Sequence, residues 1–181
     1  MIEWDQTYTG RRIDPLNPKP ADIDIEDIAH ALAMMCRYGG NVSRFYSVAE
    51  HSILVSQHVA PQYAREALLH DACEAGAVDM PRWLKRLPAI RAIVVGLELR
   101  RTNAIYERFG IESTRESRAA VKSIDKRIVV DEINELKTYP EMYTDRYRGV
   151  QPVGADIIGY SPEHAKVMFL LRFYELWPVV N

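Results

Sequence analysis

Residues 67–74 read Ala-Leu-Leu-His-Asp-Ala-Cys-Glu, an apolar run that carries three ionisable side chains. Burying such groups in an apolar segment costs free energy unless a partner compensates them. On a helix, Glu74 would lie four residues beyond His70 and three beyond Asp71, on the same general face. His70 and Asp71 would lie about 100° apart, close enough to lean toward one ion. The stretch therefore predicts a helix that supplies half of a metal site.

The composition and length of the chain are typical of one globular domain. Of the 181 residues, 48% are apolar and 27% are charged, which separates the chain from disordered proteins. This length suffices to bury a core, so we expect a single domain over residues 1–181. The net charge of −2 gives no reason to expect nucleic acid or a membrane as a partner. An anionic substrate must therefore be met by local Arg and Lys.

Neither the cysteines nor the start of the chain indicates export. Cys36 and Cys73 are far apart and form no C-x-x-C pair. The first residues lack a basic segment followed by an apolar run, and no uncharged apolar run approaches the ~20 residues needed to span a bilayer. The expected location is cytoplasmic.

The spacing of apolar residues predicts an all-α fold, a compact bundle of about six helices. Residues 1–22 lack a helical period and contain several prolines, so they predict an arm or a short hairpin. Residues 139–160 also lack a clear period, and a loop this long is usually functional or covered by another subunit. With the apolar, tyrosine-rich tail, this loop suggests a homo-oligomer. The expected helices cover residues 24–37, 47–60, 62–75, 90–109, 113–133 and 161–177.

Two of these helices begin with a capping box, in which the cap residue and a Glu three positions later bond each other's backbone N–H groups. The first, Ser47–Glu50, opens the helix that places His51 in its second turn. The second, Ser113–Glu116, opens a helix whose apolar side is interrupted by Asp125. A charge within an apolar stripe is costly, which makes Asp125 a candidate functional residue.

Four polar side chains interrupt apolar stripes and form the candidate metal site: His51, His70, Asp71 and Asp125. Two imidazoles and two carboxylates suit one divalent transition metal, Zn, Co, Mn or Fe, better than Mg, which prefers oxygen ligands. Four protein ligands on a five- or six-coordinate ion leave room for water and substrate, as a catalytic metal requires. The other histidines are interpreted as packing or surface residues: His30, His58 and His164.

Four separated blocks resemble, in the same order, the H…HD…D pattern of the HD-domain phosphohydrolases. The resemblance spans roughly residues 25–136 and is closest to the bacterial 5′-deoxynucleotidases and to the deoxynucleoside triphosphate triphosphohydrolases found in some phages. A lone HD dipeptide carries little information, whereas four blocks in order are specific for the superfamily. The matching blocks are Ser47–Ser52, Leu69–Glu74, Asp79–Pro81 with Lys85, and Lys122–Asp125.

The resemblance implies roles for the residues at matching positions. Glu74 and Asp79 would be catalytic, Glu74 by handling protons and Asp79 by positioning water or substrate. The implied metal ligands are His51, His70, Asp71 and Asp125.

The implied substrate-binding residues are Arg37 and Tyr38 near the nucleotide and Lys85 and Lys122 at the phosphates. Lys122 precedes Asp125 by three residues, so on a helix the two side chains share one face. The deoxynucleotidases carry a tryptophan after the arginine that tests the sugar for a missing 2′-hydroxyl. Here Tyr38 and two glycines follow the arginine, so deoxy selectivity by that route is not implied.

The resemblance implies a metal-dependent enzyme of a bacterial or phage-infected cell that hydrolyses (deoxy)nucleotide phosphoesters. The leading expectation is a triphosphohydrolase that converts a dNTP, with dATP as one candidate, to deoxynucleoside and tripolyphosphate. The alternatives are a 5′-deoxynucleotidase acting on dNMPs and a non-catalytic nucleotide-binding module. Basic residues in segments without a helical period could converge on the longer phosphate chain, or equally be solvated or bind a neighbouring subunit: Arg11, Arg12, Arg44, Arg146 and Arg148.

Overall fold

The computed structural model describes residues 4–76, 85 and 87–178. About 63% of the chain is helical, which confirms the all-α prediction. None of the helices described has the length and apolar character needed to cross a membrane. The α-helices are α1 (Ile25–Met34), α2 (Val48–His58), α3 (Ala64–Leu68), α4 (Pro88–Phe109), α5 (Arg115–Leu136) and α6 (Pro162–Leu176). Short 3₁₀ helices are η1 (Pro20–Asp22), η2 (Arg37–Gly40), η3 (Pro61–Tyr63), η4 (Ala72–Gly76) and η6 (Pro140–Tyr143).

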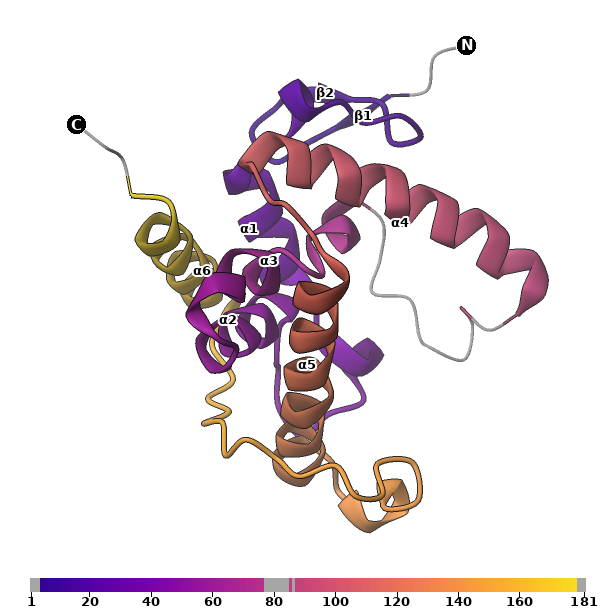
Figure 1. The fold of residues 1–181 in the computed structure, drawn as a ribbon, viewed down its shortest axis with the longest axis vertical. Helices are drawn as coiled ribbons and strands as arrows, with labels where there is room; N and C mark the ends of the chain where they lie inside the picture. The colour runs from indigo at the N-terminus through magenta and orange to yellow at the C-terminus, as the bar shows by residue number, and fades with distance from the viewer. Residues whose placement is uncertain (1–3, 77–84, 86, 179–181) are drawn as a thin grey trace.

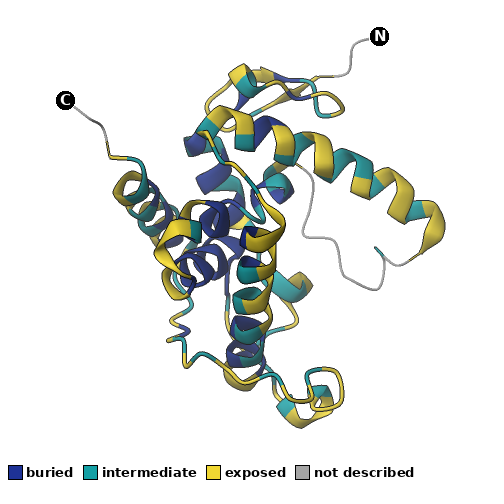
Figure 2. Ribbon diagram, viewed as in Figure 1, coloured by how far each residue is buried: buried dark blue, intermediate teal, exposed yellow. Residues whose placement is uncertain are grey.

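Helix α2 lies at the centre of the bundle and packs against α1, α3, α5 and α6 (Figure 1). Its residues 48–56 are all buried, so the helix contributes to the apolar clusters on both of its sides. One cluster is shared with α1 and α6, and the other with α3 and α5. Figure 2 shows these central helices as the most deeply buried part of the fold. A polar side chain on α2 is therefore held rigidly.

The predicted N-terminal arm is a hairpin of β1 (Asp5–Gln6) and β2 (Arg12–Ile13), paired antiparallel. Two contacts attach this hairpin to the start of α1. The backbone N–H of Thr9 donates to Asp27 at 2.7 Å, and Arg11 forms an ion pair with Asp24 at 2.7 Å. The expectation of a short hairpin is confirmed.

Three predicted caps are confirmed: Asp24 caps α1, Ser47 caps α2 and Ser161 caps α6. Both capping boxes are wrong in part. The Glu50 carboxylate turns away from the start of α2 and bonds another segment. Helix α5 begins one residue later than expected, because Thr114 and Ser117 form the box in place of Ser113 and Glu116.

Helix α1 ends at Met34, three residues before the predicted end at Arg37. Beyond it the chain becomes extended, and Cys36 pairs with Ser47 in an isolated bridge. The backbone N–H of Arg37 donates to the carbonyl of Tyr46 at 2.8 Å. This pairing competes with the last helical turn and brings Arg37 beside the start of α2.

The predicted continuous helix over residues 62–75 is wrong. Helix α3 ends at Leu68, a turn carries His70 and Asp71, and η4 follows. The His70 Nδ1 atom donates to the carbonyl of Ala67 at 2.7 Å. In an α-helix that carbonyl would accept the N–H of Asp71, so the imidazole replaces the next helical bond and ends the helix. The predicted loop at residues 76–82 falls mostly outside the described residues.

Candidate metal centre

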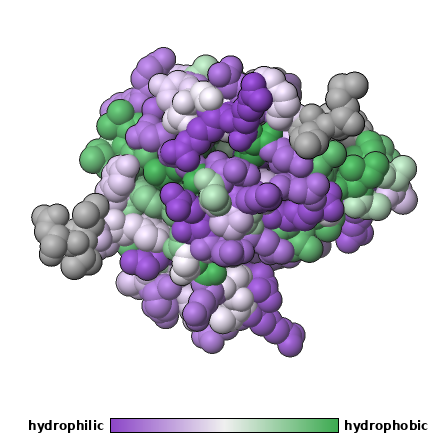
Figure 3. Space-filling model, turned by 90° about the horizontal axis from the view of Figure 1, so that it is seen from above, coloured by the Kyte–Doolittle hydropathy of each residue, from purple (hydrophilic) through white to green (hydrophobic). Residues whose placement is uncertain are grey.

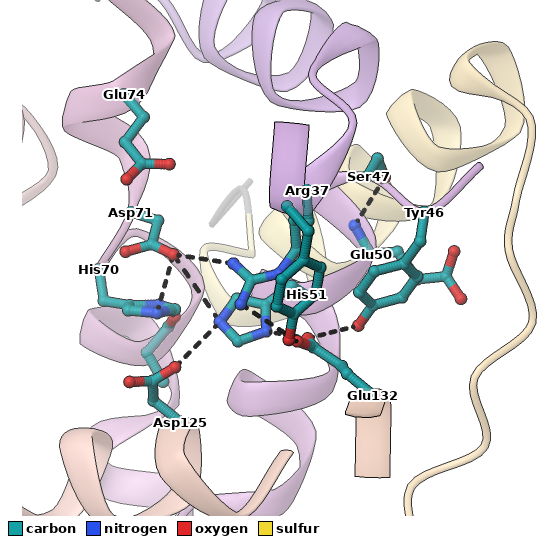
Figure 4. Close-up of polar contacts among 12 residues, drawn as sticks. Arg37, Tyr46, Ser47, Glu50, His51, His70, Asp71, Glu74, Asp125 and Glu132 are labelled. Atoms are coloured by element: carbon teal, nitrogen blue, oxygen red, sulfur yellow. Dashed lines mark hydrogen bonds and ion pairs between the residues drawn. The ribbon is translucent and has the colours of Figure 1, made fainter. Parts of the chain in front are cut away.

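The candidate metal ligands come from three segments that are distant in sequence. His51 lies in the first turns of buried α2, Asp125 lies midway along α5, and His70 and Asp71 occupy the turn after α3. Both α3 and α5 pack against α2. Figure 4 shows the two imidazoles and the two carboxylates gathered in one place.

Donor atoms of His51, His70 and Asp125 all lie within 4.8 Å of one another. The Nε2 atom of His51 is 3.3 Å from an Asp125 oxygen and 3.7 Å from Asp71 Oδ2. The Nε2 atom of His70 is 3.3 Å from the same Asp71 oxygen. The structure thus brings all four predicted ligands together.

The hydrogen bonds of the two histidines fit a metal ion between them. Each Nδ1 atom is engaged, that of His70 with the Ala67 carbonyl and that of His51 with Glu132 Oε1 at 2.6 Å. Each Nε2 atom is buried and has no partner of hydrogen-bond geometry in the described part of the chain. Bonding at Nδ1 orients an imidazole so that Nε2 faces a metal. The orphaned nitrogens and adjacent carboxylates are suitable ligands for Zn, Co, Mn or Fe.

Glu132 is a fully buried carboxylate that joins the side chain of His51 to three others (Figure 4). Its Oε1 atom accepts from His51 and from the Tyr46 hydroxyl at 3.0 Å. Its Oε2 atom accepts from the Tyr38 hydroxyl at 2.5 Å and from Arg37 Nη2 at 3.2 Å. Four donors satisfy the buried charge and hold the His51 ring in place.

Electrostatics agree with this arrangement. Burial alone would raise the pKa of Glu132, but the charges of Arg37 and His51 lower that pKa to about 2. Burial and Arg37 each lower the pKa of His51, yet the charge and hydrogen bond of Glu132 and the contact with Asp125 together raise it to about 9. A metal ion at His51 would have to compete with the proton that Glu132 and Asp125 favour there. The pKa of Asp125 is lowered despite burial, because of its contact with His51.

Of the two predicted catalytic residues, Glu74 lies within the described residues and Asp79 does not. Glu74 lies in η4 beside Asp71 and is almost fully buried (Figure 4). Lys85 Nζ approaches Glu74 Oε1 at 3.5 Å and forms a shorter ion pair with Glu98 of α4 at 2.7 Å. Lys85, predicted to face phosphates, therefore bridges two carboxylates. Asp79 lies outside the described residues.

Arg37 and Tyr38, predicted near the nucleotide, contact the metal centre through Glu132. The Arg37 guanidinium also approaches Asp71 Oδ2 at 3.6 Å. Tyr38 has φ of 58°, a left-handed conformation that costs a non-glycine residue about 1–2 kcal/mol. The hydroxyl bond to Glu132 and the Lys137 ammonium, 4.2 Å from the ring centroid, hold the side chain in place.

Lys122 is exposed on α5, one turn before Asp125. It lines an open groove of about 620 Å³ between α5 and the long loop, together with Lys126 and Arg127. Arg127 donates to the backbone carbonyls of Gln151 and Pro152, which fixes the loop as the far wall. The groove is lined by three cationic side chains and no carboxylate, so it is suited to an anion.

The five arginines expected to converge on a long phosphate chain are engaged elsewhere. Three form ion pairs: Arg11 with Asp24, Arg44 with Glu135, and Arg148 with Asp145. Two lie over aromatic rings: Arg12 over Trp4 and Arg146 over Tyr147. Their scattered partners give no support to convergence at the metal centre.

The sequence reasoning missed the supporting residues of the site. Glu132 lies seven residues after Asp125, two turns along the same face of α5, so the rule that singled out Asp125 could have found it. Glu50 was read only as a cap, although its carboxylate accepts three backbone N–H groups from residues 158–160 at 2.8–2.9 Å. Asp131 of α5 accepts two more from the same loop, at Val153 and Gly154. The long loop is therefore attached to both α2 and α5.

Two known proteins align with almost the whole chain. Uncharacterized protein YfdR of Escherichia coli (strain K12) is 34% identical over 175 residues, which cover 94% of each chain. Uncharacterized protein RCAP_rcc00048 of Rhodobacter capsulatus is 36% identical over 188 aligned positions, covering 96% of this chain and 95% of that protein. The chain belongs to the family that contains these two proteins, whose names state no activity. A scan against models of known protein families found no match.

Proposed function

We propose that the protein is a metal-dependent phosphohydrolase of the HD-domain type that acts on nucleotides. The observation that carries this proposal is the meeting of two buried, unbonded Nε2 atoms with the Asp125 carboxylate inside 4.8 Å. A histidine and carboxylate set of this kind favours one Zn, Co, Mn or Fe ion over Mg. Asp71 supplies the fourth ligand, since its oxygen lies within 3.7 Å of both Nε2 atoms.

When bound, such an ion would acidify a water molecule and polarise a phosphoryl oxygen. The neighbouring side chains account for the rest of the proposed reaction. Glu74, buried beside Asp71, would accept the proton of the attacking water and return it to the leaving oxygen. Lys85 holds that carboxylate from the side of α4, and Lys122 would neutralise the substrate phosphate one turn from Asp125.

A groove lined by Lys122 and Lys126 of α5 supports a substrate with several phosphates. Lys122 and Lys126 lie in the same stretch of α5 as Asp125, so an α-phosphate near the ligands could extend its β- and γ-phosphates along them. A dNTP is therefore our first candidate substrate, with release of tripolyphosphate. A 5′-deoxynucleotidase acting on dNMPs is the alternative, since it would need only Lys122.

The test is to incubate the purified protein with each dNTP, dNMP and ribonucleotide in the presence of Mn²⁺ or Co²⁺, and to separate the products by chromatography. Tripolyphosphate indicates the proposed cut, whereas free phosphate from dNMPs indicates the nucleotidase. Binding of nucleotide with no product from any substrate would favour a non-catalytic binding module.

Two variants test the assigned roles. Asp71→Ala should lose the metal and activity together, by elemental analysis and product formation. Glu74→Ala should retain the metal but lose turnover, because only the proton acceptor is removed. Full activity of Glu74→Ala would refute its role.

A further inference from the structure

A pocket of about 400 Å³ lies at the C-terminal end of α5. It is at the lower end of this helix in Figure 1, away from the hairpin and from the end of the molecule that faces the viewer in Figure 3. Three segments line it: residues 40–43, residues 136–138 at the end of α5, and residues 139, 142 and 143 in and before η6. The volume of the pocket lies within the range of sites for small molecules.

One wall of the pocket is shaped by a left-handed turn. Tyr38, Gly39 and Gly40 have φ of 58°, 60° and 79°. Glycine adopts such values freely, whereas Tyr38 must be held there by its surroundings. The turn brings the chain back to the end of α5, where the backbone N–H of Ser43 donates to the carbonyl of Leu136 at 2.9 Å. This wall is therefore fixed to the helix.

The other wall carries exposed aromatic and apolar side chains. Tyr139 is 62% exposed, Met142 is 79% exposed, and Tyr143 also lines the pocket. Large apolar side chains that border a hollow are typical of a binding site. Aromatic side chains also stack on the bases of nucleotides, whichever base is present. This wall is therefore suited to a flat ring.

Lys137 is the cation of the pocket, and no carboxylate is among the residues that line it. Its ammonium donates to the carbonyl of Asn41 and lies 4.2 Å from the centroid of the Tyr38 ring. Neither contact supplies a full negative charge. Burial lowers the pKa of Lys137, against the smaller effects of Cys36 and Glu132. An anionic group in the pocket would provide the counter-charge that the ammonium lacks there.

The pocket is separate from the metal centre. Asp125, Glu132 and Leu136 follow one side of α5, at spacings of seven and four residues. Leu136 lies about 16 Å beyond Asp125 along the helix, at 1.5 Å per residue. Between them is Glu132, fully buried and bonded to Tyr38 and Arg37. This buried cluster separates an occupant of the pocket from the metal ligands.

We propose that this pocket binds a nucleoside monophosphate, with its base against Tyr139 and its phosphate at Lys137. Each part of that ligand has a counterpart in the walls: an aromatic side chain for the base, the hydroxyls of Ser43 and Thr138 for the sugar, and one ammonium for one phosphate. A longer phosphate chain would bring more negative charge than one lysine compensates. The proposal depends neither on the metal centre nor on the proposed reaction.

The experiment is isothermal titration calorimetry of the full chain with AMP, in the presence of a chelator so that no metal ion holds the phosphate. We expect a dissociation constant below about 1 mM. Lys137→Met should weaken AMP binding about tenfold or more, because it removes the charge and keeps the length of the side chain, whereas Lys137→Arg should stay within about threefold of the wild type. Tyr139→Ala should weaken binding about fivefold or more, and Tyr139→Phe should not, because the ring is kept.

Lys126→Met is the matched control, because it removes an ammonium of α5 from the groove beside residues 149–151 and not from this pocket. We expect no change in AMP affinity from it. The proposal is overturned if AMP does not bind by about 1 mM, or if Lys137→Met or Tyr139→Ala binds AMP like the wild type. It is also overturned if the conservative variants lose as much affinity as these two, or if Lys126→Met weakens binding as much as Lys137→Met.

Discussion

Glu132→Gln removes one buried charge while keeping the size and shape of the side chain. The carboxylate receives bonds from His51, Arg37, Tyr38 and Tyr46, so the substitution leaves the Arg37 guanidinium poorly compensated. The lowering of the Glu132 pKa from 4.5 to about 2 corresponds to roughly 3 kcal/mol of stability. Truncating one member of a buried ion pair costs a similar amount. For a chain of this length we expect a fall in Tm of roughly 10 °C.

The substitution should also weaken metal binding. This effect distinguishes a role of Glu132 in the proposed metal centre from a purely structural role. Glu132 fixes the His51 ring through Nδ1, and loss of such a partner typically costs 10–100-fold in metal affinity. The affinity is measured by competition with a chromophoric chelator, and Tm is measured with chelator and with added Zn²⁺ or Co²⁺. The metal-induced rise in Tm should be smaller in the variant.

Glu135→Gln provides the comparison, since Glu135 lies three residues further along α5 and forms a half-exposed ion pair with Arg44. A surface pair is worth about 1 kcal/mol or less, so neither Tm nor metal affinity should change much. If Glu132→Gln lowers Tm but leaves metal affinity within twofold of the wild type, the reasoning that links Glu132 to the metal through His51 is wrong.

Three further predictions concern the rest of the site. In steady-state kinetics, Lys122→Ala and Lys126→Ala should each raise KM for dNTPs severalfold, whereas only Lys122→Ala should raise KM for dNMPs. If Lys126→Ala raises KM equally for dNTPs and dNMPs, the groove is not a polyphosphate site. Glu50→Gln should cost about 3 kcal/mol and speed hydrogen exchange in the long loop, because three backbone N–H groups lose a charged acceptor. In the chelator-treated protein, the ionised Glu132 carboxylate stabilises the fold above about pH 4.5, because its pKa is lower in the folded state than in the unfolded state. This contribution to the free energy of unfolding should be lost as the pH falls toward 2, and circular dichroism can follow the unfolding.

The sequence was sufficient to predict the all-α class, several helix starts and the side chains that meet at the candidate site. Asp24 and Ser161 mark helix starts through a local rule, in which a short polar side chain accepts a backbone N–H, and the structure follows it. His51 and Asp125 could be identified because each places a polar group in an apolar stripe. Such signals depend on neighbours in sequence, so no knowledge of the fold is needed.

Features set by contacts between distant segments were not predictable in the same way. Helix α3 ends because the His70 ring donates a hydrogen bond to the Ala67 carbonyl in place of the next backbone N–H. The spacing of apolar residues does not distinguish this bond from a continued helix. Glu50 matched the pattern of a capping box, yet its carboxylate found three N–H groups more than a hundred residues away. Lys85 matched a phosphate-binding position, but its pairing with Glu98 requires knowledge of where α4 lies.

The bonds of the long loop to Asp131 and Glu50 divide it into two parts that should differ in how well they accept inserted residues. Residues 153–160 are bonded to Asp131 and Glu50, so added residues there would pull on α5 and α2. Residues 139–149 include no buried residue and lie before the first attachment. A peptide tag or fluorescent domain inserted near Asp145 should therefore be accepted without loss of solubility, and would give a reporter site on the protein away from both chain ends.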